Sequence, residues 1–160
     1  MGANTVDTGY TYIVLLNWNG WRDTIACLES LCALDHQRTR IVVCDNDSSD
    51  GSLEQIQAWC RAEIAAELPA NDRLRATMRA RPEPVPFTST TASAVAAGSA
   101  EAGDSPIVLI DNEGNLGFAG GNNVGLRLAL AQADMAYAWL LNNDTLVEPG
   151  CLAAMRGALI

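Results

Sequence analysis

Apolar residues occur along this chain in two patterns, short uninterrupted runs and longer stretches with helical spacing. The four runs lie in predicted strands over Tyr12–Leu16, Arg40–Cys44, Ile107–Ile110 and Tyr137–Leu141. A short run without alternation is typical of a strand buried on both faces of a parallel sheet. Because a helical stretch follows each run, the order predicts right-handed crossovers and a doubly wound α/β sheet.

The helical stretches show apolar residues at intervals of three and four positions, which predicts helices lying on the sheet. The first covers residues 21–34. The second begins at Ser52 and is closed by Pro69, the third continues from Val124, and the fourth follows Pro149.

Two segments lack these patterns. Residues 1–11 form a polar leader, and the signal is weak from Pro69 to Ser105. We interpret about 82–105 as a flexible surface insertion, because its Pro, Thr, Ala, Gly and Ser residues bury too little apolar surface to offset the entropy of ordering. The predicted organisation is therefore one α/β domain over residues 12–160.

Composition restricts the possible functions. A chain of 160 residues that is 49% apolar can bury one core. Its net charge of -9 argues against binding nucleic acid, which usually needs a basic surface. All ten basic residues are arginines, so chemistry that needs a lysine, such as that of a P-loop, is excluded within this sequence.

Cysteine usage and hydropathy bear on location. The five cysteines are odd in number and form no C-x-x-C pair, which indicates reduced, buried thiols rather than disulfides or zinc. No apolar run approaches the ~20 residues that span a bilayer. We expect no transmembrane segment and a cytoplasmic location, which leaves open peripheral attachment at the inner face of the membrane. His36, the only histidine, is given no catalytic role.

Polar loops follow all four predicted strands. Because carboxyl ends of parallel strands share one edge of a sheet, we expect these loops to converge there. They contain Asn17 and Trp18, then Asp45 and Asn46, then four glycines between Gly114 and Gly121, and finally Asn142, Asn143 and Asp144.

Each loop offers chemistry suited to a nucleotide. Trp18 can stack on a base, and Asp45 and Asn46 can bind a base edge or a ribose hydroxyl. The glycines allow close approach to a diphosphate at a helix start. Asp144, a lone carboxylate among amides, suits a hard divalent cation that keeps waters and phosphate oxygens as ligands. Each loop taken alone is also explained as a turn or a helix cap.

Two other enzyme classes fit less well. Asp45-Asn-Asp47 after an apolar strand is also how phosphotransferases of the haloacid-dehalogenase type begin, but those enzymes rely on a lysine. A Rossmann dehydrogenase requires G-x-G-x-x-G after the first strand, and Leu16-Asn-Trp-Asn-Gly20 does not supply it.

Four segments taken together resemble the family 2 glycosyltransferases, and in particular the bacterial rhamnosyltransferase-like members. They are Ile13–Asn19, Ile41–Ser52, Asn112–Gly125 and Leu140–Thr145. Four motifs in order are far more specific than one. The resemblance implies a GT-A fold, and transfer of a sugar, with rhamnose as a candidate, from a nucleoside-diphosphate donor to a glycan or lipid-linked acceptor, with inversion at the anomeric carbon.

The resemblance also implies roles for residues. The D-x-D metal motif of the family falls on Asn142-Asn143-Asp144, where the first acid is an amide. We therefore expect Asp144 to be the main ligand of Mg²⁺ or Mn²⁺, with Asn142 beside it and a weaker metal dependence. The residues expected to bind the donor are Leu16, Asn17, Trp18, Asp45, Asn46, Gly114, Asn115, Gly120, Asn122 and Asn143.

Members of the family continue past the position of Ile160 into a half that holds the acceptor site and the general base. We therefore interpret the chain as a donor-binding half, from a fragment or a truncated gene product. It is expected to bind a UDP or dTDP type of nucleotide weakly and not to turn over alone. The alternative is a catalytically inactive, glycosyltransferase-like interaction module.

Overall fold

The computed structural model describes residues 9–35, 38–79 and 83–159. The strands are β1 (Tyr10–Asn17), β2 (Thr39–Asp45), β3 (Phe87–Thr91), β4 (Ile107–Asp111) and β5 (Met135–Asn142). The helices in the described residues are α1 (Trp21–Cys32), α2 (Ser52–Cys60), α3 (Asp72–Arg75), α4 (Ala92–Ala96), α5 (Gly117–Leu130) and α6 (Cys151–Gly157).

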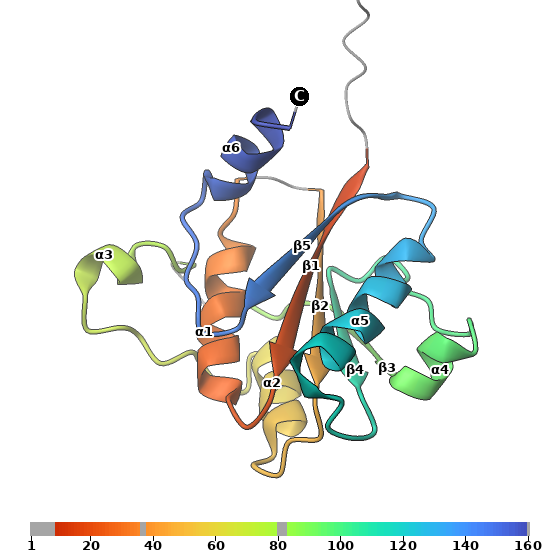
Figure 1. Cartoon of the computed structure of the whole chain (residues 1–160). Helices are drawn as coiled ribbons and strands as arrows, with labels where there is room; N and C mark the ends of the chain where they lie inside the picture. The colour runs from red at the N-terminus through yellow and green to blue at the C-terminus, as the bar shows by residue number, and fades with distance from the viewer. Residues whose placement is uncertain (1–8, 36–37, 80–82, 160) are drawn as a thin grey trace, which may run out of the picture.

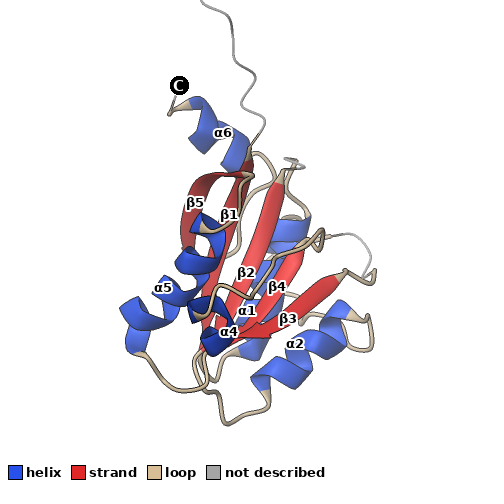
Figure 2. Ribbon diagram, turned by 90° about the vertical axis from the view of Figure 1, so that its right-hand side faces the viewer, coloured by secondary structure: helices blue, strands red, loops and turns tan. Residues whose placement is uncertain are grey.

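The strands form one sheet in the order β3-β4-β2-β1-β5, and every neighbouring pair is parallel. Helices α1 and α2 lie on one side of the sheet, and α4 and α5 lie on the other (Figure 1). Figure 2 shows the same layers from a second direction. The predicted parallel α/β sheet flanked by helices is confirmed.

Alternate residues of the central strands pack into two apolar clusters. On the α1 and α2 side, Leu15 of β1 belongs to a cluster with Trp59 of α2. On the other side, Val14 of β1 belongs to a cluster with Leu128 of α5. All four side chains are buried. Strand β1 therefore reads as an unbroken apolar run because it has a core on both faces.

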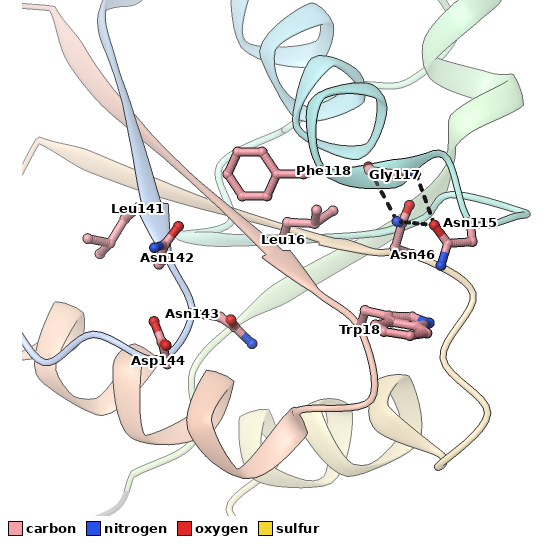
Figure 3. Close-up of a pocket in the computed structure, with 10 residues that line it drawn as sticks. All are labelled: Leu16, Trp18, Asn46, Asn115, Gly117, Phe118, Leu141, Asn142, Asn143 and Asp144. Atoms are coloured by element: carbon pink, nitrogen blue, oxygen red, sulfur yellow. Dashed lines mark hydrogen bonds between the residues drawn. The ribbon is translucent and has the colours of Figure 1, made fainter.

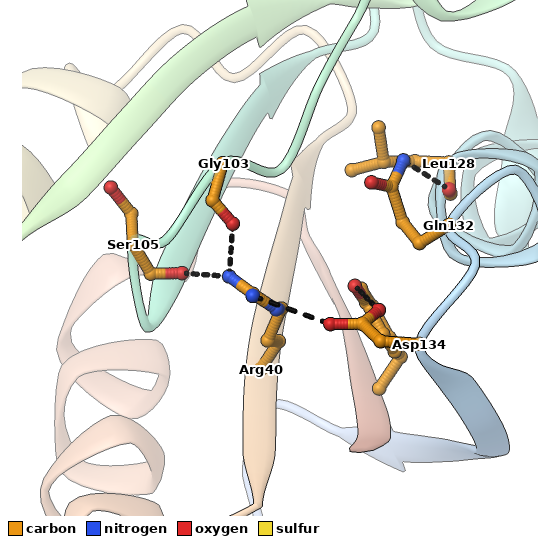
Figure 4. A network of polar contacts seen from close by, with 7 residues as sticks. Arg40, Gly103, Ser105, Leu128, Gln132 and Asp134 are labelled. Atoms are coloured by element: carbon orange, nitrogen blue, oxygen red, sulfur yellow. Dashed lines mark hydrogen bonds and ion pairs between the residues drawn. The ribbon is translucent and has the colours of Figure 1, made fainter. Parts of the chain in front are cut away.

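The Arg40 side chain, on β2, contacts the segments just before β4 and β5 (Figure 4). These contacts lie at the amino edge of the sheet, opposite the edge where polar loops were predicted. Arg40 Nη1 donates to the carbonyls of Gly103 and, at 3.2 Å, Ser105, just before β4. Its Nη2 lies 3.3 Å from the Asp134 carboxylate, just before β5. The Tyr12 hydroxyl donates to the other oxygen of Asp134 at 2.8 Å. This network fixes the amino edge of the sheet.

The prediction that β5 is buried on both faces is wrong. Strand β5 is at the edge of the sheet and pairs only with β1 in the described structure. Its burial alternates along its length, and Leu140 is 49% exposed. Trp139 and Leu141 pack against the cluster on the α1 side, whereas the opposite face is left largely open. An apolar run alone does not distinguish an edge strand of this kind from a central one.

The segment interpreted as a flexible insertion at about 82–105 contains regular structure. Strand β3 pairs with β4 over its whole length, and α4 follows directly. Thr91 caps α4 through its side chain, and Glu113 accepts a hydrogen bond from the Ser93 N–H at 2.7 Å. The Thr-rich sequence of β3 suits a half-buried edge strand, because β-branched residues favour the extended backbone.

Two helix boundaries differ from the prediction. Helix α2 ends at Cys60 rather than before Pro69, because Ala62 adopts a left-handed φ of 57° and the Glu63 N–H bonds back to the Ala58 carbonyl. Helix α5 begins at Gly117, seven positions before Val124, so part of the glycine-rich segment is helical.

The remaining predictions concern the termini and the membrane. Residues 1–8 of the predicted leader and His36 lie outside the described residues, and β1 begins at Tyr10. In the described part of the chain, none of the helices combines the length and the apolar character that a membrane crossing requires.

Candidate functional site

A pocket of about 490 Å³ lies at the carboxyl edge of the sheet (Figure 3). It is bounded by the exit of β1, the turn after β5 and the start of α5. In Figure 3 the residues after β5 lie on one side and the contact between Asn46 and Asn115 lies on the other. The lining residues are Leu16, Trp18, Asn46, Asn115, Gly117, Phe118, Leu141, Asn142, Asn143 and Asp144.

The pocket brings together most of the predicted site residues. Seven of them line it: Leu16, Trp18, Asn46, Asn115, Asn142, Asn143 and Asp144. Five others do not line it: Asn17, Asp45, Gly114, Gly120 and Asn122. Residues from β1, β2, β5 and the segment before α5 therefore converge on one edge, as expected for the carboxyl ends of parallel strands.

Of the two residues at the carboxyl end of β1, Asn17 lies inside the protein and Trp18 lies at its surface. Asn17 is fully buried, and its amide oxygen accepts a hydrogen bond from Thr24 Oγ1 at 2.7 Å. Its amide nitrogen donates to Asp45 Oδ1 at 2.6 Å. Trp18 is 59% exposed and presents its ring to the pocket. The structure thus places Asn17 behind the pocket and Trp18 in it.

Asp45 is held inside the protein by its neighbours. Its Oδ1 also accepts from the Ser48 hydroxyl at 2.7 Å, and its Oδ2 accepts from the Ser48 N–H at 3.0 Å. The residue is 3% exposed and does not line the pocket. Asp45 therefore holds the loop after β2 in shape and lies outside the pocket lining.

Asn46 joins β2 to the glycine-rich segment. Its amide nitrogen donates to Asn115 Oδ1 at 2.9 Å, and its amide oxygen accepts from the Leu116 N–H at 3.0 Å. The Asn115 oxygen also accepts from the Gly117 N–H at 2.9 Å. These contacts hold the residues before α5 at the rim of the pocket.

Two residues predicted to lie in the glycine-rich loop belong to α5 instead. Gly120 and Asn122 are in its first turns, and Asn122 is buried and donates to the Phe118 carbonyl at 2.9 Å. Gly114 precedes the helix and is outside the pocket lining. The glycine that requires its small size here is Gly121, where a Cβ atom would overlap Leu16 Cδ1.

The turn after β5 has the features of a weak cation site. Asn142 and Asp144 are exposed, and the Asp144 carboxylate makes no hydrogen bond or ion pair with any described residue. No group of three or more His, Cys, Asp or Glu residues in the described part could hold an ion. This donor set fits Mg²⁺ or Mn²⁺ only if water and a ligand supply the other oxygens.

The Cys27 thiol lies near this turn, and burial disfavours its ionised form. Burial and, to a smaller extent, the negative charge of Asp144 raise the pKa of Cys27, on α1, to about 12. Cys27 is therefore a neutral thiol and no candidate cation ligand. Asp144 remains the ionisable side chain of the pocket lining.

Three residues of this edge were missed by the sequence analysis. Phe118 and Leu141 line the pocket as apolar surface. Thr24 is fully buried and links Asn17 to Asn143, whose amide donates to Thr24 Oγ1 at 2.9 Å. A signal for Thr24 exists in the sequence, because it lies on the apolar stripe of the first helix.

Comparisons with known proteins concern the family and the fold of the chain. Residues 12–80 match the profile of the family described as Glycosyl transferase family 2. The fold is similar to two crystal structures of S. aureus TarS residues 1–349, one of them in complex with UDP, each with a TM-score of 0.54 and 15% identity. The match covers 92% of this chain and 31% of the TarS chain. No curated protein matches the sequence.

The similarity to TarS concerns the fold, a Rossmann-like parallel sheet of the GT-A type. The family profile covers β1, α1, β2 and α2, whose loops form one side of the pocket. On these two findings, residues 12–80 resemble glycosyl transferase family 2, and the chain has a fold of the GT-A type.

Proposed function

We propose that residues 12–160 form the part of a glycosyltransferase that binds a nucleoside-diphosphate sugar. The observation that carries the proposal is the pocket at the carboxyl edge of the sheet, where Trp18, the start of α5 and the Asp144 turn meet. Ligands of open α/β sheets bind at this edge. UDP in the TarS complex supports a uridine or thymidine nucleotide.

The lining suggests how a donor would lie. The exposed ring of Trp18 offers a stacking surface for the base. Gly117 and Phe118 begin α5, whose N-terminus has no side-chain cap. The Gly117 N–H is already bonded to Asn115 Oδ1, but the next N–H groups of the first turn and the helix dipole favour a diphosphate at this position. Asn115 lies beside them and is available to the sugar or the diphosphate.

A divalent cation would be held by Asp144, with Asn142 as a second oxygen ligand. When bound, such a cation offsets the charge of a leaving diphosphate. One carboxylate and one amide make a weaker site than two carboxylates, so we expect a modest metal dependence.

The pocket supports binding better than turnover. Asp144 is the one ionisable residue among those that line it. If Asp144 holds the cation, the described lining provides no carboxylate to deprotonate an acceptor hydroxyl. We propose that inverting transfer to a glycan or lipid-linked acceptor needs a general base that the described lining of this pocket does not supply. This chain spans 31% of the TarS chain.

Calorimetry of UDP, dTDP and GDP, with and without Mn²⁺, tests the proposal. We expect UDP or dTDP to bind, Mn²⁺ to strengthen binding, and Asp144→Ala to remove that strengthening. Asp104→Ala, which replaces an exposed acid outside the pocket lining, is the matched control. If none of the three nucleotides binds, the proposal is wrong.

The second candidate is a non-catalytic interaction module of the same lineage. The lack of a second ionisable residue in the pocket lining favours it. It predicts no nucleotide binding, so the same calorimetry separates the two. A haloacid-dehalogenase-type phosphotransferase is disfavoured, because its nucleophile would be Asp45, which is buried and hydrogen bonded.

A further inference from the structure

A chain of side-chain hydrogen bonds runs beneath the pocket and joins the ends of three strands. Asn143, after β5, donates to Thr24 Oγ1 at 2.9 Å. Thr24, on α1, donates to Asn17 Oδ1 at 2.7 Å, and Asn17 donates to Asp45 Oδ1 at 2.6 Å. We call Asn143, Thr24, Asn17 and Asp45 the edge network.

The donors and acceptors of the edge network fix one another. The Asp45 carboxylate accepts, so Asn17 must turn its amide nitrogen toward it and its amide oxygen toward α1. The single proton of the Thr24 hydroxyl is then used on Asn17, which leaves the Thr24 oxygen to accept from Asn143. The orientation of Asn143 is thus set by Asp45, two strands away.

Burial makes the centre of the edge network stiff. Thr24 and Asn17 are both 0% exposed, so water cannot replace a lost partner. The backbone also approaches closely, because a Cβ atom at Gly20 would lie 3.3 Å from the Asn143 amide nitrogen. A buried polar group without a partner is costly, so the network resists rearrangement.

Asn143 is the residue between the two proposed cation ligands. Asn142 and Asp144 are exposed, whereas Asn143 is half-buried and turned toward Thr24. With Asn143 anchored inward, its two neighbours are held at the pocket side of the turn. Breaking the anchor frees the turn to move relative to Trp18 and the loop after β2.

We propose that Thr24 is a positioning residue that couples cation binding at Asn142 and Asp144 to nucleotide binding on the β1 and β2 side of the pocket. The inference rests on the proposed function, since both ligands belong to that site. A diphosphate and a cation bind together best when their two groups of ligands are held at a fixed separation. By linkage, each ligand then strengthens the binding of the other by the same factor.

The measurement is the Mn²⁺ enhancement, defined as the factor by which Mn²⁺ raises the affinity of the 160-residue chain for UDP in calorimetry. Thr24→Val keeps the shape of the side chain and removes both hydrogen bonds of the hydroxyl. We expect it to reduce the enhancement by roughly 2- to 30-fold, the usual range for residues that carry coupling between sites. Thr24→Ser restores the hydroxyl and should restore the enhancement.

Thr11→Val is the matched control. Thr11 is also buried, and its hydroxyl oxygen accepts from Arg156 at 3.0 Å, but it lies at the amino end of β1. The Thr11→Val variant should lose a similar hydrogen bond and keep the full Mn²⁺ enhancement. A general loss of stability would instead lower the enhancement in both valine variants, and that result would overturn the inference.

Asn143→Ala removes the hydrogen bond between Asn143 and Thr24 at its more exposed side. This variant tests the inference if Thr24→Val does not fold. Where both variants fold, their combined effect on the enhancement should be no larger than that of either one. An unchanged enhancement in Thr24→Val overturns the inference but leaves the proposed function standing. If Asn143→Ala is the only variant that folds, an unchanged enhancement in that variant has the same consequence. Absence of UDP binding by the unmodified chain overturns the proposed function and the inference with it.

Discussion

Replacing Asn46 with alanine is expected to destabilise the fold and release the segment before α5. The Asn46 amide nitrogen donates to Asn115 Oδ1 at 2.9 Å and to the Gly117 carbonyl at 3.4 Å. Its oxygen accepts from the Leu116 N–H at 3.0 Å and from Asn112 Nδ2 at 3.2 Å. Alanine removes all of these contacts at once.

The hydrogen-bond partners of Asn46 differ in how much stabilisation each one loses in Asn46→Ala. Asn115, Leu116 and Gly117 are exposed, so water replaces much of what Asn46 provided. Asn112 is buried, and leaving its amide nitrogen without a partner costs about 1–3 kcal/mol. We expect the free energy of unfolding to fall by about 2–3 kcal/mol, which lowers Tm by about 4–12 °C for a chain of this size.

Urea denaturation measures the change in stability, and amide hydrogen exchange over residues 113–118 measures the release of the segment. Asn115→Ala, which removes one exposed partner, is the control and should cost less than about 1 kcal/mol. A loss below about 0.5 kcal/mol for Asn46→Ala would be ordinary for a surface position and would refute the reasoning. Unchanged exchange in residues 113–118 would refute the proposed anchoring.

Three further predictions concern the core, the amino edge and pH. Gly125→Ala places a Cβ atom 2.6 Å from Val14 Cγ1 and 2.9 Å from Cys44 Sγ, so it should cost about 1–3 kcal/mol in thermal unfolding, and a neutral result would contradict this packing. Arg40→Ala leaves two carbonyls and a carboxylate without their cation and should cost about 2–4 kcal/mol in urea, whereas an effect below about 1 kcal/mol would mean that the network adds little. Burial raises the pKa of Cys27 and Cys44 to about 12, so both thiols stay neutral in the fold while those of the unfolded chain ionise above about pH 8.5. The contribution of these two thiols to stability should therefore be constant below that pH and fall by about 1.4 kcal/mol per thiol per pH unit between about pH 9 and 11, measured by urea unfolding under reducing conditions; a profile that stays flat over that range would contradict the burial.

The sequence predicted the parts of the fold that depend on local pattern. Runs such as Tyr12–Leu16 and Ile107–Ile110 become strands of a parallel sheet, and the loops after them converge. It did not predict that β5 lies at an edge, because strand order is decided by tertiary packing. It also missed β3, whose Thr-rich sequence carries no apolar run and is ordered by pairing with β4.

The candidate site was predicted at the level of loops rather than of single side chains. Residue type does not show whether an amide faces a ligand or another loop. Asn17 and Asn46 illustrate this, because both are amides at strand ends and both are bonded to protein neighbours. Trp18 and Asp144 make no such contacts in the described structure and face the pocket. Only the three-dimensional hydrogen-bond partners separate the two groups.

The exposure of Trp18 gives the protein an intrinsic optical probe at the site. Of the four tryptophans, Trp59 is fully buried and Trp21 and Trp139 are partly buried, so these three should fluoresce at shorter wavelength than Trp18, whose exposed indole should emit furthest to the red. A base lying flat on Trp18 would quench that red component and leave the blue one unchanged. Titrations followed by emission alone can therefore distinguish occupation of the pocket from a change in the core.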